Sequence, residues 1–167
     1  MDADLVSLSE SIGTAALADA SQRPVLIATA ESCTGGWAAQ VITHTAGSSG
    51  WFERGFVTYS NEAKIEMLGV RPVTLEKFGA VSQETASEMA EGTLKNSSAL
   101  ISLSITGIAG PTGGSPGKPV GTVCFAWCRK GEKATADTII FAGNREEIRR
   151  QAVIYALQGL LERIGTT

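Results

Sequence analysis

The chain has 167 residues, of which 43% are hydrophobic and 19% are charged, and its formal net charge is −3. This composition is typical of a globular protein and argues against intrinsic disorder. The acidic balance gives no electrostatic reason to expect nucleic-acid binding. No segment is long and apolar enough to span a bilayer, and the opening residues MDADLVSLSE lack the features of a signal peptide. We therefore expect one cytoplasmic domain over residues 1–167, with no membrane or nucleic-acid partner.

The cysteine and histidine content limits the possible chemistry. The sequence contains Cys33, Cys124, Cys128 and a single histidine, His44. An odd number of cysteines without a secretory signal argues against a disulfide framework, and one histidine offers no Cys/His zinc spacing. We interpret Cys124 and Cys128 as buried thiols, and we expect neither a metal ion nor a cofactor.

Hydrophobic periodicity predicts alternating helices and strands in the first half of the chain. The first amphipathic helix is marked by Leu5, Leu8, Ile12, Ala16 and Ala20. The apolar run 25–28 predicts a buried strand, and a second helix follows after residue 36. Residues 51–59 predict a second strand with Gly55 as a bulge. Ser60 is placed to cap a short helix over 61–68.

The second half of the chain does not continue this alternation but ends in a hairpin and a long helix. Ser82 begins a helix that continues to Lys95, and a strand follows over 100–105. A long loop rich in Gly and Pro covers 107–119, and residues 120–128 and 135–141 predict a hairpin. Asn144 and Glu147 suit a capping box at the start of the last helix. These elements predict an α/β fold, a three-layer α/β/α sandwich with a mixed, mainly parallel sheet.

The stretch 30–36, AESCTGG, joins the first strand to the second helix and carries polar side chains at the carboxyl end of that strand. Ligands bind at this edge of open α/β sheets. Ser32 is a candidate nucleophile, and Lys64 could accept its proton if burial keeps the amine neutral. Tyr59 could relay the proton or hold the lysine in place. The N–H groups of Cys33 and Thr34 could bind an oxyanion.

Other interpretations of these residues remain open. Cys33 is a rival nucleophile, because a helix N-terminus lowers the pKa of a thiol. In the plainest interpretation, Ser32 and Thr34 only cap the helix and Lys64 is solvated. The loop 107–117 could cradle a phosphate or be a flexible surface loop, and it lacks the spacing of a P-loop. The remaining cations are interpreted as an outward helix face (Arg145, Arg149 and Arg150) and as possible anion partners (Arg54 and Lys118).

Several segments, taken in order, resemble the CinA C-terminal-domain family. They are AESCTGG (30–36), AGSSGWFERGFVTYSNEAK (46–64), LGV (68–70), GAVSQETA (79–86), SITGIAGPTGGS (104–115) and KPVGTV (118–123). The resemblance implies that the chain is a nicotinamide-nucleotide amidase. Such an enzyme hydrolyses the carboxamide of nicotinamide mononucleotide to nicotinate mononucleotide and ammonia, in pyridine-nucleotide recycling.

The resemblance also implies a serine–lysine site without metal, acting through an acyl-enzyme. It places the catalytic serine at Ser32, the lysine at Lys64 and a tyrosine at Tyr59, with Ser48 as a second candidate serine. The residues expected to bind the substrate or its oxyanion are Cys33, Thr34, Gly35, Ser48, Thr106 and Gly107. Those expected to bind its phosphate are Gly110, Gly113, Gly114 and Lys118.

Two alternatives stand beside this hypothesis. One is an amidase that uses Cys33. The other is a non-catalytic nucleotide-binding module, or an interaction protein connected with competence or DNA damage, as older naming of the family suggests. We further expect a homodimer, with Trp37, Trp51 and Phe52 as candidate interface residues. For Trp51 and Phe52, a place in the core is the alternative.

Overall fold

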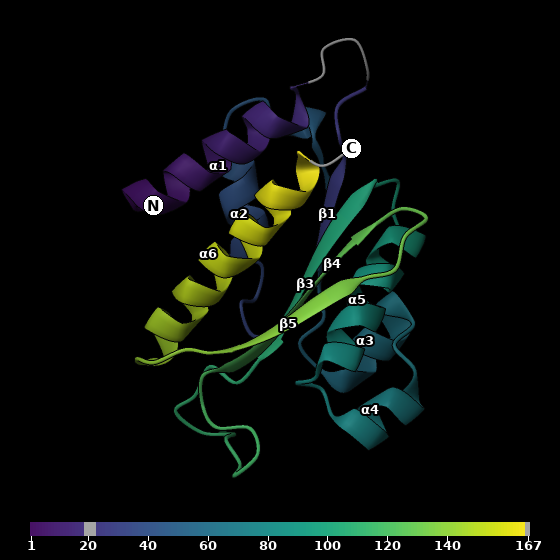
Figure 1. Cartoon of the computed structure of the whole chain (residues 1–167), viewed down its shortest axis with the longest axis vertical. Helices are drawn as coiled ribbons and strands as arrows, with labels where there is room; N and C mark the ends of the chain where they lie inside the picture. The colour runs from purple at the N-terminus through teal and green to yellow at the C-terminus, as the bar shows by residue number, and fades with distance from the viewer. Residues whose placement is uncertain (19–22, 166–167) are drawn as a thin grey trace.

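The structure is a computed structural model that describes residues 1–18 and 23–165. A five-stranded sheet in the order β2-β1-β3-β4-β5 forms its middle layer (Figure 1). The strands are β1 (Ile27–Glu31), β2 (Phe52–Val57), β3 (Ile101–Gly107), β4 (Thr122–Arg129) and β5 (Thr135–Ile140). β2, β1 and β3 pair in parallel, whereas β4 is antiparallel to both β3 and β5. The predicted mixed sheet is therefore confirmed, and β4 alone runs against the other strands of this sheet.

Helices cover both faces of the sheet, which confirms the predicted three-layer α/β/α sandwich (Figure 1). One face carries α1 (Ala3–Ala16), α2 (Trp37–His44) and α6 (Arg145–Ile164). The other carries α3 (Asn61–Leu68), α4 (Pro72–Phe78) and α5 (Gln83–Lys95). A short 3₁₀ turn, η1 (Ser48–Gly50), precedes β2. Within residues 1–18 and 23–165, no helix has both the length and the hydrophobicity needed to cross a membrane.

Local capping explains where several helices begin. The Ser60 and Ser82 side chains accept hydrogen bonds from the N–H groups of the third helical residues, and Asn144 forms the predicted capping box with Glu147. The three predicted starts are therefore confirmed. Cys124 and Cys128 are buried free thiols, as expected.

Three details differ from the sequence-based predictions. β1 continues to Glu31, beyond the apolar run, because helices cover both faces of the sheet and even Thr29 is fully buried. The bulge lies at Glu53, where the register moves from Phe52 opposite Ile27 to Arg54 opposite Ala28. Gly55 has another role, since a Cβ there would lie 2.8 Å from Thr29 Oγ1. The predicted Ala20 of the first helix lies outside the described residues.

Trp51 lies in the core, which is one of the two places, core or interface, that the sequence left open for it. It is 4% exposed, and a Cβ at Gly13 of α1 would lie 2.7 Å from its ring. The indole therefore fills the space between α1 and the start of β2 and cannot contribute to a surface of association.

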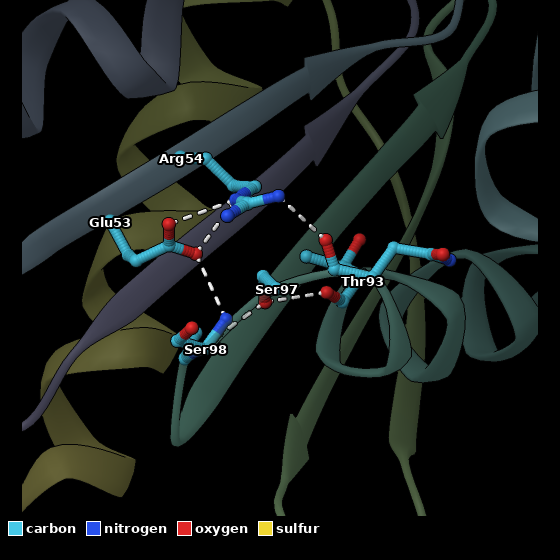
Figure 2. A network of polar contacts seen from close by, with 7 residues as sticks. Glu53, Arg54, Thr93, Ser97 and Ser98 are labelled. Carbon is cyan, nitrogen blue, oxygen red and sulfur yellow. Dashed lines mark hydrogen bonds and ion pairs between the residues drawn. The ribbon is translucent and has the colours of Figure 1, made fainter.

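A surface network fastens the edge strand β2 to the connection between α5 and β3 (Figure 2). Glu53 and Arg54 form an ion pair with an N–O distance of 2.8 Å. Arg54 Nη1 donates to the Asn96 carbonyl at 3.0 Å, and the Ser98 N–H donates to Glu53 Oε2 at 3.0 Å. Arg54 therefore has a structural role here and is not the anion partner suggested by the sequence.

The polar segments of the chain converge at one edge of the sheet. The carboxyl ends of β1, β2 and β3 lie together there, beside the start of β4 and the end of β5. The segments 32–36, 58–60, 108–121 and 141–144 therefore surround a common space, as expected for an α/β sheet.

Candidate active site

Ser32 and Lys64 meet at this edge. Ser32 follows β1 directly, whereas Lys64 lies on the first turn of α3, which follows the neighbouring strand β2. Lys64 Nζ lies 3.1 Å from Ser32 Oγ. Lys64 is 1% exposed and Ser32 is 8% exposed, so the contact is shielded from water. The structure thus brings together the two side chains on which the predicted chemistry depends.

Main-chain carbonyls, and no carboxylate, surround the amine of Lys64. Nζ donates to the carbonyls of Thr58 at 3.0 Å and Tyr59 at 3.4 Å, and among the described residues it forms no ion pair. Burial lowers the pKa of Lys64 below its ordinary value of 10.5. Once the amine is neutral, the two carbonyls can accept its two hydrogens. Its lone pair then faces Ser32 Oγ and can accept the hydroxyl proton.

Glu31 holds the elbow between β1 and α2 in place. Its buried carboxylate accepts hydrogen bonds from Thr34 Oγ1 at 2.7 Å and from the N–H groups of Ala38 at 2.8 Å and Ala39 at 3.1 Å. Thr34 therefore contacts Glu31, and the N-cap of α2 is Gly36 without a side-chain cap. The interpretation of Ser32 and Thr34 as helix caps is wrong. Glu31 was not identified from the sequence as the residue that positions the elbow. A carboxylate just before a helix could have indicated this role, because it can accept hydrogen bonds from the N–H groups at the helix start.

Three backbone N–H groups of the elbow have no partner among the described residues. They belong to Cys33, Thr34 and Gly36, whereas the N–H groups of Ser32 and Gly35 donate to the carbonyls of Ile105 and Ser32. Gly35 has a φ of +59°, in the left-handed region that favours glycine. An elbow of this shape leaves main-chain donors next to the serine, which is the arrangement that an oxyanion requires.

Ser32 and Lys64 open onto a cavity of about 270 Å³. Three of the converging segments, 32–36, 58–60 and 108–121, contribute to its lining, together with α3, α6 and the ends of neighbouring elements. The other lining residues include Cys33, Tyr59, Asn61, Ala80, Thr106, Gly107, Gly110, Gly113 and Arg145. Thr106 Oγ1 already donates to the Ala80 carbonyl at 2.8 Å, so this hydroxyl fixes the cavity wall. Of the residues predicted to bind substrate or phosphate, five line this cavity: Cys33, Thr106, Gly107, Gly110 and Gly113.

The other predicted binding residues lie elsewhere. Thr34 and Gly35 line an adjoining groove of about 560 Å³ with Trp37 and Arg149. Lys118 donates to the Phe78 carbonyl at 2.7 Å and so fastens the Gly-rich loop to the end of α4. Among the described residues, neither Lys118 nor Gly114 lines the cavity or the adjoining groove, because the loop turns outward beyond residue 113.

Ser48 is not at the site. It belongs to η1, before β2, and its hydroxyl donates to the Thr43 carbonyl at 3.3 Å. Because β2 runs parallel to β1, a residue before β2 lies at the opposite edge of the sheet from Ser32. The prediction of Ser48 as a second candidate serine is therefore wrong.

Tyr59 contacts Lys64 through its carbonyl and not through its phenol. The tyrosine is 60% exposed, and Arg145 Nη2 donates to its hydroxyl at 3.1 Å. The same arginine donates from Nη1 to the Gly110 carbonyl at 2.7 Å, so it bridges two loops at the mouth of the cavity. The predicted proton relay through the phenol is wrong, and the assignment of Arg145 to an outward helix face is also wrong.

The thiol of Cys33 is a poor rival nucleophile. Burial raises the pKa of Cys33 to about 11, so the thiol stays protonated at neutral pH. Nor do the described ranges contain a group of three or more His, Cys, Asp or Glu side chains that could hold a metal ion. The Ser32–Lys64 pair is therefore the nucleophile–base arrangement that the geometry favours.

The family model described as "CinA C-terminal domain" matches residues 9–164 of this chain. The chain belongs to the CinA C-terminal domain family. Among its CinA-family relatives, a protein of Escherichia coli K12 named nicotinamide-nucleotide amidohydrolase PncC is 55% identical over 159 residues, covering 95% of this chain and 94% of the relative. A protein of the same name from Pseudomonas putida is 51% identical over 140 residues, covering 84% and 86% of the two chains.

Solved structures of CinA-family proteins have the same fold. The crystal structure of the competence/damage inducible protein CihA from Agrobacterium tumefaciens superposes with a TM-score of 0.91 at 42% identity, covering 97% of this chain and 96% of the other. A competence damage-inducible protein from Klebsiella pneumoniae superposes with a TM-score of 0.90 at 38% identity, covering 97% and 98% of the two chains. Sequence and fold therefore agree on the family.

Proposed function

We propose that this CinA-family protein hydrolyses the carboxamide of nicotinamide mononucleotide, giving nicotinate mononucleotide and ammonia for pyridine-nucleotide recycling. The observation that carries the proposal is the buried 3.1 Å contact between Lys64 Nζ and Ser32 Oγ, in which the amine has no carboxylate partner among the described residues. A pure binding protein has no need of such an unpaired amine beside a hydroxyl. The names of the E. coli and P. putida relatives supply the substrate.

The first half of the reaction acylates Ser32. Neutral Lys64 accepts the hydroxyl proton while Ser32 Oγ attacks the carboxamide carbon. The carbonyl oxygen becomes an oxyanion, which the free N–H groups of Cys33 and Thr34 stabilise. The intermediate then collapses as protonated Lys64 gives its proton to the departing nitrogen, so the C–N bond breaks and ammonia leaves.

The second half of the reaction releases the product. Lys64, neutral again, accepts a proton from a water molecule that attacks the ester carbon of the acyl-enzyme. The C–O bond to Ser32 breaks, and Lys64 returns the proton to Ser32 Oγ. The positive charge of the pyridinium ring makes the carbonyl carbon more electrophilic in both halves, which reduces the activation that serine needs.

The phosphate of the substrate is assigned to the mouth of the cavity. Arg145 lines both the cavity and the adjoining groove, and it forms no ion pair within the described residues. Gly110 and Gly113 line the cavity beside it and could offer main-chain N–H groups. This arrangement favours a mononucleotide over free nicotinamide, because only the nucleotide carries an anion for Arg145.

The experiment is an assay of ammonia release from nicotinamide mononucleotide in the presence of a chelator, with nicotinate mononucleotide identified by mass. We expect turnover by the wild-type protein and by Ser48→Ala, whose serine lies at the opposite edge of the sheet. We expect no turnover by Ser32→Ala with unchanged circular dichroism. Near-normal turnover by Ser32→Ala would remove Ser32 from the mechanism, and an inactive wild-type protein would refute the proposed function.

A further inference from the structure

Arg149 reaches from α6 to the elbow, 116 residues earlier in the chain. Its Nε donates to the carbonyl of Cys33 at 3.0 Å, and its Nη2 donates to the carbonyl of Thr34 at 3.3 Å. One guanidinium therefore holds two consecutive peptide groups. The planar fork of arginine suits this task, because its donors keep a fixed spacing that a lysine ammonium lacks.

The contact with the Cys33 carbonyl also sets the direction of the next N–H group. In a trans peptide, the carbonyl of Cys33 and the N–H of Thr34 belong to one plane and point in opposite directions. With Arg149 on the carbonyl, the Thr34 N–H must point away from Arg149. The Thr34 N–H donates to no acceptor in the part of the chain that the structure describes, so it is available to a ligand.

The charge of Arg149 is available to polarise this peptide. No carboxylate pairs with it among the described residues, and the guanidinium lies over the Trp37 ring at 5.6 Å from the centroid. A cation at a carbonyl oxygen draws electron density from the peptide, so the N–H of the same peptide becomes a stronger donor. Arg149 therefore acts on the elbow through orientation and through charge.

The neighbouring arginine on α6 shows a different use of the same side chain. Arg150 pairs with Asp2 at 2.9 Å and with Asp4 at 3.1 Å, and so fastens the start of α1 to α6. It makes no contact with the elbow. Arg150 is thus a matched control, an arginine one residue along the same helix whose contacts are structural.

From these contacts we propose that Arg149 is a positioning residue for the oxyanion site. It fixes and polarises the Cys33–Thr34 peptide so that the Thr34 N–H can receive the negative charge that develops on the carboxamide oxygen. The inference rests on the proposed amidase function. Glu31 holds the same elbow from its other side through Thr34 Oγ1, so the loss of Arg149 should not unfold it.

Steady-state kinetics of Arg149→Met and Arg150→Met with nicotinamide mononucleotide test the inference. An oxyanion donor acts only in the transition state, so we expect Arg149→Met to lower kcat by about 10- to 100-fold with KM changed by less than about threefold. Arg150→Met should keep kcat. Guanidinium ions at millimolar concentration should restore part of the kcat of Arg149→Ala. A rise in KM at constant kcat would show that Arg149 binds the substrate anion, and equal kcat in both Met variants would show that it has no special role; either result overturns the inference.

A second measurement does not depend on turnover. In the ¹⁵N-labelled protein without substrate, the Thr34 amide resonance should move upfield in Arg149→Met and stay in place in Arg150→Met. If the wild-type protein releases no ammonia, the proposed function fails, and the Thr34 resonance alone then decides the role of Arg149. An unchanged resonance in Arg149→Met would refute the contact as a source of polarisation.

Discussion

The β2 edge and the cavity at the carboxyl end of the sheet use charge in opposite ways. At the edge, Glu53 and Arg54 neutralise one another in side chains that are 19% and 49% exposed (Figure 2). In the cavity, Lys64 is buried against carbonyls and a hydroxyl, and it pairs with no carboxylate in the described part of the chain. A solvated ion pair contributes little to the stability of a protein. An unpaired buried amine lowers the stability of the folded state, but its lowered pKa makes it a better base near neutral pH. The environment of Lys64 is therefore suited to reactivity, whereas the Glu53–Arg54 pair is suited to holding β2 against the connection between α5 and β3.

The largest effect should come from Lys64→Met, which keeps the length of the side chain and removes the amine. We expect kcat/KM for ammonia release to fall by about 10³-fold or more, because a general base contributes about 10²- to 10⁴-fold and here also protonates the leaving group. Steady-state assays measure the loss, and circular dichroism confirms folding. A folded variant that retains a tenth or more of the activity would exclude Lys64 as the base.

The next effect should come from Glu31→Gln, with Glu53→Gln as its surface counterpart. Gln at position 31 retains one oxygen but places an amide donor where the carboxylate accepted from a main-chain N–H. We expect the free energy of unfolding to fall by about 1–3 kcal/mol, since a buried donor loses its acceptor.

Urea unfolding of both variants measures this difference, and ammonia release should fall in Glu31→Gln as the elbow loosens. For Glu53→Gln we expect a loss below about 1 kcal/mol, because the ion pair is solvated, and no change in activity. Equal losses of stability in the two variants would contradict the contrast between the two regions.

The smallest effect should come from Tyr59→Phe. The phenol contacts Arg145, and only the carbonyl of Tyr59 contacts Lys64, so the substitution leaves the base untouched. We expect kcat within about fivefold of wild type, the size of one partly exposed hydrogen bond. A fall as large as that of Lys64→Met would restore the phenol to the mechanism.

Much of the fold was predictable because it is encoded locally. Ser60, Ser82 and Asn144 cap the helices that immediately follow them, and the mixed strand directions follow from crossovers and one hairpin. The meeting of Ser32 with Lys64 was predictable too, because each residue follows one of two strands whose carboxyl ends share an edge.

The rest depends on geometry that no short stretch of sequence specifies. Arg145 and Arg149 reach the site only because α6 begins at the carboxyl edge and presents that face to the elbow, which is a matter of tertiary packing. The direction of the Tyr59 phenol is set by Arg145, a residue 86 positions away. Ser48 was misplaced because its segment matches the family, whereas its distance from Ser32 follows from the parallel pairing of β1 and β2.

Burial lowers the pKa of the Lys64 amine in the folded protein, which is the property that the proposed chemistry requires, and the pH dependence of stability tests it most directly. The unfolded chain restores the ordinary pKa of 10.5, whereas the folded pKa of Lys64 is lower, so the folded state binds fewer protons between the two values. Burial of the amine therefore destabilises the folded state. This destabilisation is fully present below the folded pKa of Lys64 and disappears as the pH rises through 10.5.

The measurement is the free energy of unfolding in urea, compared between wild type and Lys64→Met across neutral to alkaline pH. We predict that wild type gains stability relative to Lys64→Met as the pH rises. A difference that stays constant with pH, or that reverses sign so that wild type loses relative stability, would contradict the claim.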